Sequence, residues 1–441
     1  MSAVLKQATP AVADHRALRF LTAGSVDDGK STLIGRLLFD SQAILADQLQ
    51  NLEKRAAGAP VDLSLLTDGL EAEREQGITI DVAYRYFATR SRKFIIADAP
   101  GHEQYTRNMV TAAAGSDAAV VLVDITKIDW KSGAPVQLLP QTRRHALLAH
   151  LLRVPSIVFA VNKLDAVDDP ERAFAATQAA LQAFAAEAGI TTVAATIPVS
   201  ALRGDNVTLP LDVPWYRGPS LLQLLERLPT TQERTEGSLL QPVQYVARDE
   251  AEAGQTAQGA GHQPRVFWGR IAHGSVQAGD AVQVFPSGEP AVVAEVRRAG
   301  STVARAQAGE SAGIVLDRQL DISRGDWIGS PGGLQPAQRF TATLAWLDTE
   351  PATVGRKYWV RHGNRWVQAR IEAIAHRLDI HNLQPVDADS LQVNEIGDVT
   401  IALQQPLPVE PYASNRVGGA LIVVDPASNR TSGALLVRSA G

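Results

Sequence analysis

The sequence predicts an α/β domain followed by two all-β domains of barrel or sandwich type. Short apolar runs alternate with amphipathic stretches up to about residue 229, which is typical of a largely parallel sheet covered by helices. Beyond that point short β-rich runs separated by Gly and Pro replace the helical spacing. A second Gly- and Pro-rich break, at residues 330–336, divides the β-rich part into two regions.

In the α/β domain each strand candidate is a short apolar run and each helix candidate has apolar residues at helical spacing. An additional segment, residues 41–76, carries leucines 45, 49 and 52 at helical spacing and is expected to include a packed helix. The expected strands are 18–23, 78–87, 94–97, 118–123, 157–161 and 193–199, and the expected helices are 32–39, 104–114, 141–152, 171–187 and 220–228.

The β-rich half begins after a polar linker at residues 230–237. His362, Gly363 and Asn364 lie between two β runs, as a hairpin turn would. We expect a tail at 1–16, the α/β domain at 17–229 and β domains at 238–331 and 337–441. The expected strands are 242–246, 266–271, 281–285, 291–296 and 312–316, then 341–347, 357–361, 366–373, 398–403 and 420–424, with a long loop at 249–264.

Composition excludes several classes of protein. The 441 residues are 45% apolar and 20% charged, with a mean hydropathy of −0.06, which is typical of a globular protein. There is no cysteine, so disulfides and cysteine-ligated metals are excluded. No apolar run is long enough to span a bilayer, no export signal is recognisable, and the net charge is −5. We expect a cytoplasmic protein with no membrane partner.

Residues 24–31, GSVDDGKS, match the phosphate-loop pattern G-x-x-x-x-G-K-[ST], between a predicted strand and a predicted helix. Glycines let backbone N–H groups approach a polyphosphate, and the helix N-terminus adds positive potential. Lys30 is expected to contact the β- and γ-phosphates, and the Ser31 hydroxyl to bind Mg²⁺. The expected phosphate-binding residues are Gly24, Ser25, Val26, Asp27, Asp28, Gly29, Lys30, Ser31 and Thr32.

Asn162, Lys163 and Asp165 directly follow the apolar run 157–161. A carboxylate at Asp165 can accept hydrogen bonds from both N1–H and N2–H₂ of guanine, a pairing that adenine cannot offer. The predicted nucleotide is therefore GTP. Ser200, Ala201 and Leu202, after the run 193–199, are a further candidate loop for contacts with the base.

The segment Asp98, Ala99, Pro100, Gly101 and His102 follows the apolar run 94–97. Asp98 is expected to hold Mg²⁺ through water, the Gly101 N–H to contact the γ-phosphate, and His102 to position the attacking water. Thr79 is expected to bring its hydroxyl to Mg²⁺ and its N–H to the γ-phosphate, in a loop that changes order on hydrolysis. No arginine is placed as an intrinsic finger, so slow basal hydrolysis is expected.

The phrases GSVDDGKST, EREQGITID, DAPGHEQYTRNM, VNKLD and VSAL, in this order before two β domains, resemble a translational-type GTPase with the architecture of elongation factor Tu. Within this group the chain resembles the large, GTPase subunits of bacterial sulfate adenylyltransferase. Asp28 stands where translation factors usually carry histidine, and the segments QTRRH, 320–326 and 376–383 also resemble those subunits.

This resemblance, which covers about residues 16–437, implies a P-loop GTPase domain followed by two β-barrel domains. It also implies a partner, the small catalytic subunit, which forms adenylyl sulfate and pyrophosphate from ATP and sulfate while GTP hydrolysis drives the step. The resemblance implies the roles predicted above for residues 27–32, Thr79, Asp98, Gly101, His102, Asn162, Lys163 and Asp165.

Two alternatives remain. The first is an elongation-factor-like carrier of aminoacyl-tRNA, for which a few well-placed arginines would be enough to contact phosphates. Residues 241–441 hold 18 Lys and Arg against 20 Asp and Glu, which gives no basic footprint, so no stable nucleic-acid partner is expected. A GTP-switch regulator unrelated to sulfate would share all the guanine motifs. Arg143, Arg144 and His145 could contact a partner, but a solvated helical face is the simpler interpretation.

Overall fold

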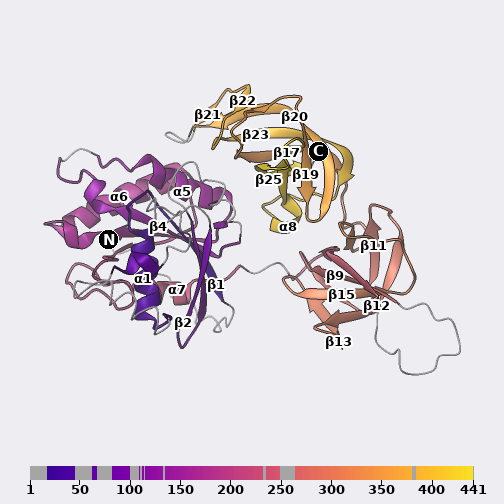
Figure 1. Ribbon diagram of the computed structural model, residues 1–441, viewed down its shortest axis with the longest axis horizontal. Helices are drawn as coiled ribbons and strands as arrows, with labels where there is room; N and C mark the ends of the chain where they lie inside the picture. Colours follow the sequence, from indigo (N-terminus) through magenta and orange to yellow (C-terminus); the bar gives the residue numbers. More distant parts are fainter. Residues whose placement is uncertain are drawn as a thin grey trace, which may run out of the picture. The chain divides into compact units, whose positions relative to one another are not determined.

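The computed structural model describes residues 17–44, 62–66, 82–99, 109, 112–113, 115–132, 135–231, 235–248, 264–379 and 384–440. Within it the chain divides after Thr231 into two compact units (Figure 1). The first unit holds one α/β sheet and the second holds two larger β-sheets. The domain boundaries given above remain predictions.

The sheet of the first unit is mainly parallel, as expected. Its strand order is β2-β3-β1-β4-β5-β6, and β2 is an antiparallel edge strand while the other neighbours run parallel. β4 and β5 are buried along their whole length, which explains their continuous apolar sequences. The strands are β1 (Leu18–Ala23), β2 (Ala83–Ala88), β3 (Lys93–Asp98), β4 (Ala118–Asp124), β5 (Ser156–Asn162) and β6 (Val193–Pro198).

The helices of this unit begin at recognisable sequence signals. Pro140 and Pro170 occupy first-turn positions, where their missing N–H costs no hydrogen bond. Ser220 forms a capping box with Gln223. The helices are α1 (Lys30–Asp40), α5 (Pro140–Leu151), α6 (Pro170–Glu187) and α7 (Leu221–Arg227), with short 3₁₀ turns at Leu63–Leu66, Ile125–Lys127 and Leu164–Ala166.

Apolar side chains of α1 and α7 share one core with the sheet. Leu33, Leu37 and Leu221 belong to this cluster together with Phe20 and Val120. The parallel strands end at a common edge, since Thr22 of β1 lies beside Asp98 of β3 and Asp124 of β4 lies beside Asn162 of β5. Ligands of parallel sheets bind at this edge, so the fold brings the predicted motifs together.

The first sheet of the second unit begins and ends with strands that are neighbours in the sequence. Its order is β7-β16-β11-β12-β15-β9-β8, with β13 beside β12. The end strands β7 and β8 are consecutive in sequence, and the buried Gln241 amide donates to the carbonyls of Phe267 and Ala312. The strands are β7 (Leu240–Pro242), β8 (Tyr245–Arg248), β9 (Arg265–Arg270), β11 (Ala281–Phe285), β12 (Pro290–Arg298), β13 (Ser301–Val303), β15 (Ser311–Leu316) and β16 (Trp327–Gly329), with a separate pair β10 (Ser275–Gln277) and β14 (Arg305–Gln307).

The second sheet of this unit is a closed barrel. Its order β19-β24-β25-β17-β23-β20 returns to β19 through a β19–β20 pairing, across the hairpin predicted at Gly363. The strands are β17 (Ala337–Trp346), β19 (Lys357–His362), β20 (Arg365–Leu378), β23 (Ile396–Leu407), β24 (Ala420–Val424) and β25 (Thr431–Ala440), with short strands β18 (Ala352–Thr353), β21 (Pro385–Val386) and β22 (Ser390–Leu391) and helix α8 (Arg416–Gly419).

Aromatic and ionic contacts join the two β-sheets of the second unit. The buried rings of Trp327 and His362 stack with centroids 4.7 Å apart, and His362 Nε2 lies 3.1 Å from the Gly418 carbonyl oxygen. Burial lowers the pKa of His362 to about 4, so the imidazole is neutral. Arg365 pairs with Asp326 at 3.0 Å. These contacts hold the two sheets in one compact unit.

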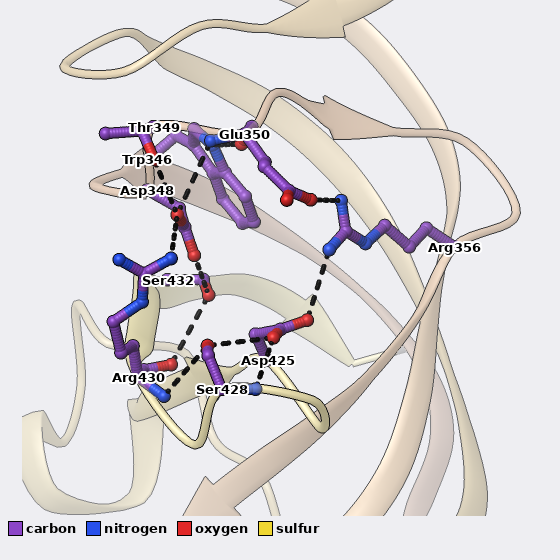
Figure 2. Close-up of polar contacts among 9 residues, drawn as sticks. All are labelled: Trp346, Asp348, Thr349, Glu350, Arg356, Asp425, Ser428, Arg430 and Ser432. Carbon is purple, nitrogen blue, oxygen red and sulfur yellow. Dashed lines mark hydrogen bonds and ion pairs between the residues drawn. The ribbon is translucent and has the colours of Figure 1, made fainter.

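A polar network ties the turn after β17 to the β24–β25 hairpin (Figure 2). Asp348 accepts a hydrogen bond from the Ser432 hydroxyl at 2.7 Å. Arg356 pairs with Glu350 at 2.8 Å and with Asp425 at 3.1 Å. The network thus joins segments that are about 80 residues apart in sequence.

In the described part of the chain, no helix is both long and apolar enough to cross a membrane.

Candidate functional site

The phosphate-loop residues 24–29 link the end of β1 to the start of α1, the setting that the motif requires. Gly29 adopts a left-handed conformation with φ 91° and ψ 27°. A Cβ at this position would lie 2.4 Å from Nδ2 of Asn162. Glycine is therefore needed for both the backbone conformation and the close approach of the neighbouring loop.

Lys30, the first residue of α1, is buried inside this loop. Its ammonium donates to the carbonyl oxygens of Gly24 at 3.0 Å and Ser25 at 2.7 Å. Burial lowers the pKa of Lys30, while the carboxylates of Asp28 and Asp98 act in the opposite direction. A buried ammonium whose direct partners are neutral carbonyls favours the approach of an anion such as a phosphate.

Asp28 is fully buried and shapes the loop from within. Its carboxylate accepts the Ser25 backbone N–H at 2.6 Å and pairs with the Lys127 ammonium at 2.9 Å. Burial raises the pKa of Asp28, and Lys127 partly offsets this effect. The carboxylate is thus held by one backbone donor and one cation that lies 99 residues away in sequence.

The buried side chain of Asn162 connects three of the predicted motifs. Its Nδ2 donates to the Asp28 carbonyl oxygen at 2.8 Å, and its Oδ1 accepts the Ala201 N–H at 2.9 Å. Asn162 therefore joins the phosphate loop to the loop that follows β6, and both its hydrogen-bonding groups are satisfied.

The remaining residues predicted to contact the base lie in the loops that follow β5 and β6. Lys163 has a left-handed backbone and its ammonium pairs with Asp124 at 2.7 Å. Asp165 lies exposed in the next 3₁₀ turn, with its carboxylate accessible to a ligand. The Ser200 hydroxyl accepts the N–H of residue 203, and the carbonyls of Ala201 and Leu202 accept hydrogen bonds from residue 36 of α1.

The side-chain oxygens of Asp98 and Ser31, near Lys30, are of the kind that binds a magnesium ion. Asp98 is buried at the end of β3 and accepts a hydrogen bond from the Thr22 hydroxyl at 3.3 Å, and Ser31 lies in the first turn of α1. Mg²⁺ is usually held by one or two carboxylates, waters and substrate phosphates. The described residues contain no group of three or more His, Asp or Glu that could hold a metal by itself. Ala99 is buried beside Asp98; Thr79, Pro100, Gly101 and His102 lie outside the described residues.

Two charged residues of this edge were missed in the sequence analysis. Asp124 ends β4 and is fully buried, and Lys127 follows in the next 3₁₀ turn. Burial works against the Asp124 carboxylate, but hydrogen bonds from Lys163 and Thr126 outweigh it and lower the pKa. A carboxylate that ends an apolar parallel strand was the signal available in the sequence.

The expected solvated face at Arg143, Arg144 and His145 is wrong for two of the three residues. Arg144 and His145 are buried because α5 packs against β4 and β5. Burial lowers the pKa of His145 to about 3, with Lys30 contributing. Arg143 remains near the surface, where it pairs with Glu187 of α6 at 3.6 Å.

Comparisons with known proteins agree with this architecture and confirm the predicted fold class. Residues 15–240 match the family described as the elongation factor Tu GTP binding domain, and residues 339–438 match the GTP-eEF1A C-terminal domain-like family. The chain is 43% identical to sulfate adenylyltransferase subunit 1 of Laribacter hongkongensis, over 96% of this chain and 85% of that protein.

Two further relatives show the same similarity. The subunit 1 protein of Methylorubrum populi is 45% identical, over 92% of this chain and 84% of that protein. The bifunctional enzyme NodQ of Azospirillum brasilense is also 45% identical, over 92% of this chain and 64% of that longer protein. The resemblance found in the sequence is thereby confirmed, and the chain belongs to the sulfate adenylyltransferase subunit 1 family, with an elongation-factor-Tu-type GTP-binding domain.

Proposed function

We propose that this chain is the GTP-hydrolysing subunit of a sulfate adenylyltransferase. The observation that carries the proposal is 43% identity over 96% of the chain to a subunit 1 protein, together with a GTP-binding domain at residues 15–240. In this proposal a small partner subunit forms adenylyl sulfate and pyrophosphate from ATP and sulfate. GTP hydrolysis on this chain supplies the free energy for that unfavourable step.

The proposed nucleotide site uses the common edge of the parallel strands. Phosphates occupy the loop 24–32, where Lys30 and backbone N–H groups neutralise their charge. Asp165 pairs with guanine, while residues 200–202 contact the base. Asn162 acts indirectly, because its hydrogen bonds to Asp28 and Ala201 set the distance between the loop for phosphates and the loop for the base.

Hydrolysis requires groups that respond to the γ-phosphate. We assign Ser31, Thr79 and Asp98 to Mg²⁺, which when bound would neutralise developing phosphate charge. The Gly101 N–H is assigned to the γ-phosphate. His102 would orient the attacking water and accept a hydrogen bond from it.

The proposed partner is the small catalytic subunit, in a heterodimer or a higher assembly of it. We also propose that the complex works in the cytoplasm without stably bound nucleic acid. The balance of 18 basic and 20 acidic residues in 241–441 supports this, because RNA binding relies on a concentrated basic surface.

The test is reconstitution. The chain is purified with and without the product of a neighbouring small-subunit reading frame, and sulfate-dependent pyrophosphate release is measured with and without GTP. We expect pyrophosphate release to need both subunits and to become faster when GTP is added. With the Lys30→Ala chain, release should continue at the rate seen without GTP and should not respond to GTP. A rate of pyrophosphate release that does not change when GTP is added to the wild-type complex would contradict coupling. GTP hydrolysis without any effect on sulfate chemistry would favour a GTP-switch regulator, and GTP-dependent capture of aminoacyl-tRNA would favour the carrier.

A further inference from the structure

Lys127 links the connection after β4 to the phosphate loop. Its ammonium donates to the Val26 carbonyl oxygen at 2.8 Å and to Asp28 Oδ1 at 2.9 Å. It also lies 3.6 Å from Asp124 Oδ2. One cation therefore contacts the loop at two points, a backbone carbonyl and a buried carboxylate, and is itself held by the end of β4.

The pair with Asp28 matters because that carboxylate shapes the loop. Asp28 is fully buried, and its other oxygen accepts the Ser25 N–H at 2.6 Å. The ammonium of Lys30 donates instead to the carbonyls of Gly24 and Ser25. Lys127 is therefore the cation in direct contact with Asp28 among the described residues. A buried carboxylate that loses such a partner becomes strongly unfavourable.

The same chain of charges continues toward the residues that follow β5. Asp124 Oδ2 is 2.7 Å from the Lys163 ammonium, and Asp124 Oδ1 accepts the backbone N–H and the hydroxyl of Thr126. Asp28, Lys127, Asp124 and Lys163 thus alternate in charge across the strand ends. Burial works against the Lys127 ammonium, but Asp28 and Asp124 outweigh it and raise its pKa, so it stays charged.

We propose that Lys127 is a positioning residue that holds the phosphate loop closed and thereby slows release of the bound guanine nucleotide. It acts through Asp28 and Val26 rather than by touching the nucleotide. The inference rests on the proposed nucleotide binding at this loop. Because the contacts are to the loop itself, the expected effect is on the rates at which GDP and GTP are released.

The experiment measures release of a fluorescent GDP analogue from the full chain by stopped-flow displacement with excess GDP. Lys127→Met is expected to speed release at least about tenfold, since it leaves Asp28 without its cation. Lys127→Arg keeps the charge and should stay within about threefold of wild type. Lys131→Met is the matched control, because Lys131 lies four residues further on and its ion pair, with Asp168 at 2.9 Å, is exposed at the surface.

A double-mutant cycle tests the route through Asp28. Asp28→Asn removes the buried charge, so adding Lys127→Met to it should change release by less than about threefold. If Lys127→Met changes the release rate equally in the wild-type chain and in Asp28→Asn, Lys127 does not act through Asp28. Wild-type release rates in Lys127→Met would overturn the proposal itself, whereas no nucleotide binding by the wild-type chain would contradict the proposed function on which it rests.

Thermal unfolding of each variant separates loop positioning from global stability. We expect Lys127→Met and Lys131→Met to melt within a few degrees of each other. If Lys127→Met does not fold, Lys127→Gln replaces it with the same expectation, because glutamine keeps a donor for the Val26 carbonyl but lacks the charge.

Discussion

Substitution of Gly29 by alanine tests whether the hydrogen bonds of the Asn162 side chain fix the conformation of the phosphate loop. A Cβ at Gly29 would lie 2.4 Å from Asn162 Nδ2, the atom that donates to the Asp28 carbonyl oxygen. The residue also has φ 91°, a left-handed conformation that costs a non-glycine residue roughly 1–2 kcal/mol. Displacing the buried amide from a hydrogen bond costs about another 1–3 kcal/mol.

Together these costs amount to about 3 kcal/mol for the loop in this conformation. We expect the free loop of the variant to relax away from it, so that GDP binding must restore it, which corresponds to roughly a 100-fold loss of GDP affinity. Isothermal titration calorimetry of the folded Gly29→Ala chain measures this loss. Gly189→Ala is the control for backbone strain alone, because Gly189 has φ 64° and no atom within 4 Å of an added Cβ. Asn162→Ala makes room for the new methyl group. In the Asn162→Ala chain, Gly29→Ala should therefore cost only the free energy of the left-handed backbone conformation. An affinity for GDP within threefold of wild type in Gly29→Ala would refute the reasoning.

Four further predictions follow from the site and the fold. Lys30→Ala should abolish GTP binding in calorimetry, and an unchanged affinity would remove Lys30 from the phosphate site. Asp165→Asn should reduce the preference for GTP over ATP in competition assays, because it replaces one of the two acceptor oxygens by an N–H₂ donor that faces a guanine donor. His102→Ala should retain GTP binding but slow single-turnover hydrolysis at least about tenfold, and equal turnover would exclude this histidine. Because the pKa of His362 is lowered to about 4, the unfolded chain takes up the proton first, so stability falls as the pH drops from about 6.5 to 4. Urea unfolding of the second unit should therefore show a loss of about 2 kcal/mol between pH 7 and 5 that is absent in His362→Phe.

The site motifs were predictable because each is a short contiguous segment at the end of an apolar strand. Gly24 to Lys30 between β1 and α1, and Asn162 after β5, needed only local sequence and the rule that parallel strands end at one edge. The structure adds how they meet, since Asn162 contacts both Asp28 and Ala201. The sequence pattern of an Asn-Lys-x-Asp segment carries no information on those partners.

The β-rich half was predicted less fully. The expected strand at 242–246 is two strands, β7 and β8, because the chain turns at residues 243–244 from one end of the sheet to the other. Closure of the other sheet depends on the pairing of β19 with both β20 and β24. The β19–β24 pairing joins segments that are distant in sequence, and alternating apolar residues mark a strand without naming its neighbours.

By itself the sequence predicted the order of those α/β elements that the structure describes, the phosphate loop and the residues expected to select guanine, since these follow from local spacing. Only the tertiary structure decided that Lys127 reaches Asp28, that Arg144 and His145 are buried, and that Trp327 stacks on His362. Burial and ion pairing depend on what packs against a side chain from elsewhere in the chain. That information appears only when segments 35 to 100 residues apart come into contact.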